Sequence, residues 1–330
     1  MKTLNLSIVV MIPHLFSSKK EKLYRAIKSV QKAKLRSSLK LKVRILIHLD
    51  GIKNAREKKS FEKLLEKKVG PGVYCTWCEK NIGFVGGINK AINFARKNLN
   101  FDWFIILNDD AVLVENFFSW MESYFYSRDI DVVSGIIKNI NGTTESFGLE
   151  YYQNGIALGN TKDNNPEYFC ATCFCLSGQM IEREIKRNGY VFNPLFFIYA
   201  EDLELSLRLI KDNRKIQLIP EIIAIHEGSS SVGYLSYIQV YCSFRNWIYI
   251  ILLLWDRQLI MSNIKNLIVC QLKFIKFTIV RRYYFIYPHM IKDLIKNSFQ
   301  LFQMRLNYRR NLKEFNKPFK LKYLSEPPFL

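Results

Sequence analysis

The first 113 residues alternate short apolar runs with longer amphipathic stretches, and this rhythm limits the fold more than any other feature. Four runs have the length and residue types of buried strands: LSIVVMIP (6–13), KVRILIHLD (42–50), GVYCTWCEK (72–80) and WFIIL (103–107). Three stretches between them are typical of helices: 21–36, 53–68 and 86–98. A strand–helix alternation of this kind predicts an α/β domain, with a mostly parallel sheet flanked by helices.

Polar residues fall at or just after the ends of these four strands: His14, Asp50, Asn81 and Asp110. Ligands of parallel sheets bind at the carboxyl ends of the strands, so we expect these side chains at one site. The fourth strand end is the most informative, because the apolar run of WFIILNDDAVL leads directly into Asp109 and Asp110. Burial penalises ionised groups that lack a partner, so this pair should lie where the strand emerges and bind a positive group.

A second acidic pair and a histidine occur later in the chain. In FNPLFFIYAEDLELSLRLI (192–210), bulky aromatics precede Glu201 and Asp202. The leucines that follow fit a strand alternation and a helical stripe about equally, and acids at a helix N-terminus would be a purely structural alternative. His226 ends another apolar strand in AIHEGSSSVG (224–233), and imidazole with carboxylate suits Mn²⁺ or a similar ion.

The charge of the chain is strongly positive but unevenly distributed. The 330 residues contain 49 Lys and Arg against 29 Asp and Glu, a formal charge of +20. Residues 19–69 hold 18 basic and 5 acidic side chains, and residues 256–330 hold 15 basic and 4 acidic ones, so the middle is net acidic. Two basic segments on either side of a net acidic middle segment are not typical of a nucleic-acid channel, and we expect no nucleic-acid partner.

From residue 235 the sequence mixes long apolar faces with Lys, Arg, Trp and Tyr. This composition is typical of helices in a membrane interface, and the alternative is a pair of helices packed on the domain or forming a homodimer seam. The longest unbroken apolar run, WIYIILLLW (247–255), has nine residues. A spanning helix needs about 20, so no integral membrane protein is expected. The first strand also lacks the cleavage pattern of a signal peptide.

Seven cysteines form no regular framework. Cys75 and Cys78 have CxxC spacing, and a second cluster comprises Cys170, Cys173 and Cys175. A zinc site shared by the two clusters is one interpretation. Reduced thiols packed as small apolar groups within strands are the favoured one.

Four motifs, taken in order, resemble family 2 glycosyltransferases of the GT-A fold: NIGFVGGINKAI, FIILNDDAVL, FFIYAEDLELSLRL and IHEGSSS. Bacterial polysaccharide-assembling rhamnosyl- and galactosyltransferases are the most similar members. The resemblance covers about residues 5–232. It implies a Rossmann-like GT-A domain over 1–234, with a nucleotide-sugar-binding half (about 1–113) and an acceptor half (about 114–234). A helical, basic extension follows over 235–330.

The resemblance also implies roles for particular residues. Asp110 and His226 match the family's metal ligands, Asp202 its catalytic base, and Glu201 a residue that orients the acceptor or the base. The implied donor-binding residues are Pro13, His14, Asp50, Asn81, Gly83, Asn89, Asn108 and Asp109. Among these, Asp50 would read the nucleotide base, and Asn81 with Gly83 would form a turn beside it. IPHLFSS after the first strand and Gly-Ile-Lys after Asp50 depart from the family pattern, which leaves the base and the role of His14 open.

The function implied is an inverting, metal-dependent transfer of a sugar from a UDP- or dTDP-sugar to a hydroxyl of a lipid-linked bacterial surface glycan. The cofactor would be Mn²⁺ or Mg²⁺, and the enzyme would be cytoplasmic, at the inner face of the cell membrane on anionic lipids. A nucleotidyltransferase should show a glycine-rich loop after the first strand, which IPHLFSSKK lacks. A non-catalytic sugar-nucleotide binder is a further alternative, against which the presence of Asp110, Asp202 and His226 argues.

Overall fold

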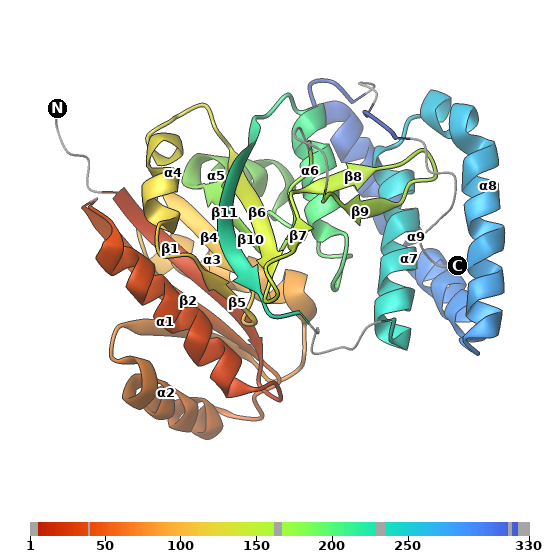
Figure 1. Cartoon of the computed structure of the whole chain (residues 1–330). Helices are drawn as coiled ribbons and strands as arrows, with labels where there is room; N and C mark the ends of the chain where they lie inside the picture. Colours follow the sequence, from red (N-terminus) through yellow and green to blue (C-terminus); the bar gives the residue numbers. More distant parts are fainter. Residues whose placement is uncertain (1–5, 39, 162–166, 229–234, 316–318, 323–330) are drawn as a thin grey trace.

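The computed structural model describes residues 6–38, 40–161, 167–228, 235–315 and 319–322 (Figure 1). A sheet of nine strands lies at its centre, with the order β3-β2-β1-β4-β10-β6-β11-β5 and with β7 attached to β6. The first four strands in this order come from the N-terminal half and pair in parallel: β3 (Val73–Cys78), β2 (Leu41–Asp50), β1 (Leu6–Leu15) and β4 (Trp103–Leu107). The predicted α/β class and parallel sheet are confirmed in this half.

The second half of the sheet is mixed. Its strands are β5 (Ala111–Leu113), β6 (Val132–Asn139), β7 (Thr144–Ser146), β10 (Cys173–Ser177) and β11 (Ile216–His226). Strand β10 runs antiparallel to both of its neighbours, β4 and β6, whereas β11 runs parallel to β6. Strand β5 pairs antiparallel with β11 at the edge. A separate two-stranded sheet consists of β8 (Leu149–Tyr151) and β9 (Ala157–Gly159).

Helices cover both faces of the central sheet (Figure 1). One hydrophobic core includes α1 (Lys20–Arg36), α2 (Ala55–Val69) and α4 (Phe117–Phe125). The opposite core includes α3 (Gly83–Asn98), α5 (Gly178–Asn188) and α6 (Glu201–Lys211). The alternating side chains of each strand divide between the two cores, as expected for a sheet that is buried on both faces.

One expectation about the second half changes in the structure, and the open choice between strand and helix after Glu201 is decided. The apolar stretch YFCATCFCLSGQMI (168–181) predicts one buried strand. In the structure the strand spans only Cys173–Ser177, because the Ser177 side chain accepts a hydrogen bond from Met180 N and begins helix α5. The segment that starts at Glu201 is a helix. Nearly all of its residues are buried, including Glu204 and Arg208, so neither a helical stripe nor a strand alternation stood out in the sequence.

Three long helices follow, as predicted for the C-terminal region: α7 (Tyr237–Leu254), α8 (Arg257–Val280) and α9 (Ile286–Asn311). Their inward side chains belong to the same core as α3, α5 and α6. Among the described helices, only α7 is long and apolar enough to cross a membrane, and 56% of that window is buried inside the protein. The division of the chain at residue 234 stays a prediction.

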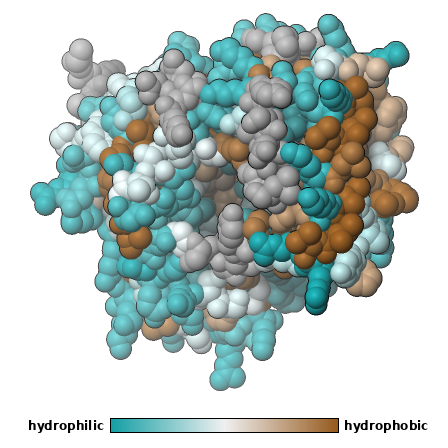
Figure 2. Space-filling view, turned by 45° about the vertical axis from the view of Figure 1, so that its right-hand side comes forward, coloured by the Kyte–Doolittle hydropathy of each residue, from teal (hydrophilic) through white to brown (hydrophobic). Residues whose placement is uncertain are grey.

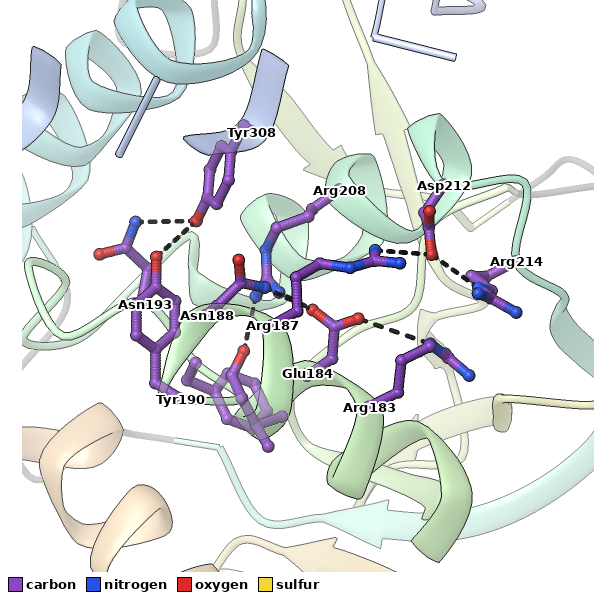
Figure 3. Close-up of polar contacts among 12 residues, drawn as sticks. Arg183, Glu184, Arg187, Asn188, Tyr190, Asn193, Arg208, Asp212, Arg214 and Tyr308 are labelled. Carbon is purple, nitrogen blue, oxygen red and sulfur yellow. Dashed lines mark hydrogen bonds and ion pairs between the residues drawn. The ribbon is translucent and has the colours of Figure 1, made fainter. Parts of the chain in front are cut away.

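A buried cluster of charges joins α9 to α6 (Figure 3). Arg208 of α6 is fully buried and forms ion pairs with Glu184 and Glu204. The hydroxyl of Tyr308 on α9 donates to Glu204 Oε1 (2.9 Å) and lies 2.9 Å from the Tyr190 hydroxyl. Buried charges need partners of this kind, so the cluster fixes α9 against the helix that begins with the second acidic pair.

Candidate active site

Asp110 and His226, which the family resemblance pairs as metal ligands, lie next to each other at the end of the sheet. Strand β5 pairs with β11 so that Ala111 lies opposite His226, and this register brings His226 Nε2 to 3.0 Å from Asp110 Oδ1. Glu145 of β7 lies on the other side of the imidazole, 2.8 Å from Nδ1. Burial lowers the pKa of His226, but hydrogen bonds and charges from Asp110 and Glu145 outweigh it and raise the pKa to about 9.

The neighbouring carboxylate has a different partner. Asp109 Oδ2 lies 2.6 Å from Nδ1 of His14, which is buried on β1. The two carboxylates at 109–110 therefore have partners on different strands: Asp109 contacts His14 of β1, and Asp110 contacts His226 of β11. Two nearby atoms, His14 Nε2 and Asn108 Oδ1, are buried without a hydrogen-bond partner among the described residues. Buried polar atoms are rarely left unpaired, so these two are consistent with the predicted binding of a sugar nucleotide.

The Asp110–His226 pair fits a divalent cation, which would replace the proton that His226 Nε2 holds toward Asp110. One carboxylate oxygen and one imidazole nitrogen converge, and a carboxylate holds the far nitrogen of the imidazole, as is usual for metal-ligating histidines. Such a pair suits Mn²⁺, or Mg²⁺ with most of its ligands from substrate phosphates and water.

A second group of ligands comprises His48, Asp50 and Cys78, whose ligand atoms lie within 4.8 Å of one another. Its thiol is a soft ligand that favours zinc over Mn²⁺ or Mg²⁺. Cys78 Sγ also already accepts a hydrogen bond from Lys90 Nζ at 3.0 Å. The Asp110–His226 pair is therefore the better match to the predicted cofactor.

The ends of β2 and β3 are linked by a tight turn before α3. Asn81 Oδ1 accepts a hydrogen bond from Gly83 N (2.8 Å), and Asp50 Oδ1 accepts one from Ile82 N (3.2 Å). Gly83 has a φ of +75°, and a Cβ at this position would lie 2.4 Å from the carbonyl oxygen of Phe197. Only glycine fits there. The predicted turn therefore exists, and it contacts the segment that leads to Glu201.

Two other residues that were predicted to bind the sugar nucleotide, Asn89 and Pro13, have surroundings that the fold itself explains. The Asn89 side chain donates to Phe192 O (2.7 Å) and accepts from Phe192 N (3.1 Å), so both ends of its amide are used within the protein. The pairing of β1 with β4 ends at Met11, before Pro13. Proline has no backbone N–H, and at this position its absence removes no hydrogen bond between the two strands. The roles of both residues in donor binding stay predictions.

Glu201 and Asp202 form a second acidic centre at the start of α6. Asp202 accepts hydrogen bonds from Ala171 N (2.9 Å) and Leu203 N (2.8 Å). Burial raises the pKa of Asp202 to about 6. Burial, together with the charge of Asp202, also raises the pKa of Glu201. Glu201 Oε2 is buried without a hydrogen-bond partner among the described residues.

One short segment contacts both acidic regions. Ala171 N binds Asp202, and the next residue, Thr172, accepts a hydrogen bond from Asn108 N through its carbonyl (3.0 Å). Neither Ala171 nor Glu145 was singled out from the sequence. An alanine offers only its backbone, and a single glutamate in a short strand carries no pattern that points to His226.

The cysteines do not form the shared zinc site considered above. Cys75 and Cys78 belong to β3, whereas Cys173 and Cys175 belong to β10, and three strands lie between β3 and β10. At the usual strand spacing the two clusters are roughly 19 Å apart, far beyond the reach of one ion. All seven cysteines, each within the described part of the chain, are free thiols.

The contact between Glu145 and His226 makes a testable prediction about metal binding. Replacing Glu145→Gln removes the carboxylate that orients the imidazole, and we expect Mn²⁺ affinity to fall about 10- to 100-fold. Isothermal titration with Mn²⁺ measures this. Glu182→Gln is the matched control, because Glu182 pairs with Arg96 on another surface and should keep wild-type affinity. Equal affinities for the two variants would contradict the assignment of His226 as a ligand.

Comparison with known proteins agrees with the fold. A sequence model described as Glycosyl transferase family 2 matches residues 9–185. The low-salt glycan biosynthesis hexosyltransferase Agl10 of Haloferax volcanii is 26% identical over 176 residues, which are 50% of this chain and 56% of Agl10. The chain thus spans little more than half the length of that relative.

Two solved structures are also similar. GalNAc-T7 with UDP, GalNAc and Mn²⁺ aligns with a TM-score of 0.55 and 14% identity over 78% of this chain and 49% of its own. Residues 1–349 of S. aureus TarS align with a TM-score of 0.49 and 13% identity over 79% of this chain and 69% of that one. The GalNAc-T7 alignment confirms the predicted fold. Since the family match covers more than half of the residues, the chain belongs to glycosyl transferase family 2.

Proposed function

We propose that this protein is an inverting, metal-dependent glycosyltransferase that moves a sugar from a UDP- or dTDP-sugar to a hydroxyl of a lipid-linked bacterial surface glycan. The observation that carries the proposal is that adjacent residues, Ala171 and Thr172, hydrogen-bond to Asp202 and to the backbone of Asn108, which precedes the first acidic pair. The family supports sugar transfer, as does the relative Agl10, a hexosyltransferase of glycan biosynthesis. GalNAc-T7, with the same fold, holds UDP and Mn²⁺.

The donor side would use Asp110 and His226 to hold the cation. When bound, the cation neutralises the negative charge that develops on the departing nucleoside diphosphate. The buried groups of His14 and Asn108 would bind the donor next to it. Because His14 already holds Asp109, the neighbouring Asp110 remains directed at His226.

On the acceptor side, Asp202 would remove the proton of the attacking hydroxyl. Its raised pKa, about 6, is suited to a base that acts near neutral pH. The pKa of Glu201 is also raised, and this favours its protonated form beside a charged Asp202. A protonated Glu201 can donate a hydrogen bond to the acceptor. A base on the side opposite to the leaving group gives inversion at the sugar carbon, as in inverting glycosidases.

An Asp202→Asn variant tests the catalytic assignment. We expect transfer to fall by at least about 10²-fold, because an amide cannot accept the hydroxyl proton. Mn²⁺-dependent UDP or dTDP binding should be unchanged. In the wild type, turnover should rise as the pH increases through about 6, since only the ionised form of Asp202 acts as a base. The measurement is release of UDP or dTDP from the nucleotide sugar between pH 5 and 8.

Asp102→Asn is the control for this experiment, because Asp102 accepts from Ser7 N at the opposite end of the sheet. Full activity in Asp202→Asn would remove Asp202 as the base. A rate that stays flat between pH 5 and 8 in the wild type would do the same.

The outer surface of α8 and α9 supports a location on a membrane. Its exposed apolar side chains include Met261, Ile264, Ile268, Leu272, Ile279, Ile291, Ile295, Phe299 and Phe302. Figure 2 shows hydrophobic surface gathered on the side of the molecule where α8 lies in Figure 1. Lysines are interspersed along the same helices: Lys265, Lys273, Lys276, Lys292 and Lys296.

We propose that this surface rests on anionic lipid at the inner face of the cell membrane. Basic side chains near an anionic surface add about 1 kcal/mol each, whereas a homodimer through the same face would place like charges opposite one another. Lipid therefore fits the combined apolar and basic character better than a second copy of the chain.

Replacing Ile268→Ser and Leu272→Ser together tests this surface, because both side chains are more than half exposed. We expect binding to phosphatidylglycerol vesicles to weaken at least tenfold, with no change in molecular mass by light scattering. Leu35→Ser is the control, because Leu35 is 84% exposed on α1. The surface would be a protein interface instead if the wild type does not bind the vesicles, is a dimer, and becomes a monomer when both substitutions are made.

A further inference from the structure

The turn before the second acidic centre is strained. Tyr199 and Ala200 have φ values of 71° and 61°, in the left-handed region that side chains other than glycine and asparagine rarely adopt. Ala200 is also the N-cap of α6 and offers no side-chain hydrogen bond to the helix. A strained conformation at a site persists only if the surroundings hold it. The residues that hold this turn come from the C-terminal helices.

Asn246 of α7 binds the turn directly. Its Nδ2 donates to the carbonyl oxygens of Ile198 (2.9 Å) and Tyr199 (2.7 Å), and the side chain is completely buried. Its Oδ1 accepts from Arg245 Nε (3.1 Å) and Nη2 (3.0 Å). An arginine can only donate, so the amide oxygen must face Arg245 and the amide nitrogen must face the turn.

Arg245 is itself fixed from three sides. Its Nη1 donates to Asp293 on α9 (3.1 Å), and its Nη2 donates to Leu195 O (3.3 Å). The guanidinium lies over the rings of Tyr241 and Tyr249, at 5.4 and 5.5 Å from their centroids. A continuous set of contacts therefore runs from α9 through α7 to residues 195–199.

We propose that Asn246 is a positioning residue for sugar transfer, holding the left-handed turn that presents Glu201 and Asp202 to the acceptor. This inference rests on the proposed function. The side chain of Asp202 is held by Ala171 N, while the backbone that leads to it is held by Asn246. Both restraints are needed to place the carboxylate, so the C-terminal helices are part of the catalytic unit as well as a surface for lipid.

Two variants test the proposal. Asn246→Ala removes the amide, and Asn246→Asp keeps the shape but cannot donate to the carbonyls. We expect turnover to fall on the order of 10²-fold, as for a small misplacement of a reacting group, with KM for the donor unchanged. The assay is Mn²⁺-dependent nucleotide release from UDP-glucose, UDP-galactose and dTDP-rhamnose. The shift in Tm caused by UDP with Mn²⁺ should stay at the wild-type value.

Asn263→Ala is the matched control. Asn263 is also buried on a C-terminal helix, but among the described residues its Nδ2 donates only to Leu259 O and Ser262 Oγ of its own helix. Its turnover should equal that of the wild type. Hydrogen exchange gives a readout that needs no activity: peptides covering residues 195–203 should exchange faster in Asn246→Ala than in Asn263→Ala, with residues 81–98 unchanged.

The outcomes separate this proposal from the proposed function. If the wild type releases no nucleotide from any donor but residues 195–203 exchange faster, the proposed function fails while Asn246 still holds the turn. If the wild type is active and Asn246→Ala matches Asn263→Ala, the positioning role is refuted. Loss of the UDP–Mn²⁺ shift together with turnover would also refute it, because Asn246 would then support the whole fold.

Discussion

Two adjacent aspartates at the end of a buried strand bind two different histidines, and this division organises the site. Asp109 is held by His14 from β1, and Asp110 by His226 from β11. The short step from β4 to β5 takes the chain from the middle of the sheet to its far edge, where β5 pairs with β11. The doublet therefore lies between the two histidines, with Asp110 directed away from β1. Most of the donor side follows from that division.

The second acidic centre depends on helices that seemed peripheral in the sequence. Helix α6 carries Glu201 and Asp202 and is buried on nearly every side. It is fixed at its middle by the Arg208 cluster, through Glu184 of α5 and Tyr308 of α9 (Figure 3). The turn before it is fixed by Asn246 of α7. The same C-terminal helices thus present an apolar and basic surface outward and restrain the acidic centre inward, which links the proposed membrane location to the chemistry.

Much of this arrangement could be predicted from one sequence, because the physics is local. Strand patterns and the exits at Asp50 and Asp110 appear within short windows, whereas the turn at Gly83 was implied by the family resemblance. The meeting of Asp110 with His226 came from the family resemblance, and the register of β5 on β11 explains it. The structure also gives His14, whose role the sequence left open, a partner in Asp109.

Other features depend on contacts between distant segments, and no local pattern encodes those. Glu145 reaches His226 across 81 residues, and Asn246 reaches Tyr199 across 47. Helix α6 gave no clear periodicity because it has almost no exposed face. The strand expected over 168–181 was too long, since the apolar pattern continues smoothly from β10 into α5 and only the Ser177 cap marks the change.

The central claim is that a divalent cation at Asp110 and His226 binds a nucleoside diphosphate at the carboxyl end of the sheet. The most direct test is the thermal stability of the protein with UDP, dTDP, GDP or CMP, each with Mn²⁺ and with EDTA. A ligand at a hundredfold excess over its Kd stabilises the folded state by about 2.7 kcal/mol, which this measurement resolves. We expect UDP or dTDP to raise the Tm with Mn²⁺ and not with EDTA. If no nucleotide raises it, or if EDTA makes no difference, the metal-dependent site is contradicted.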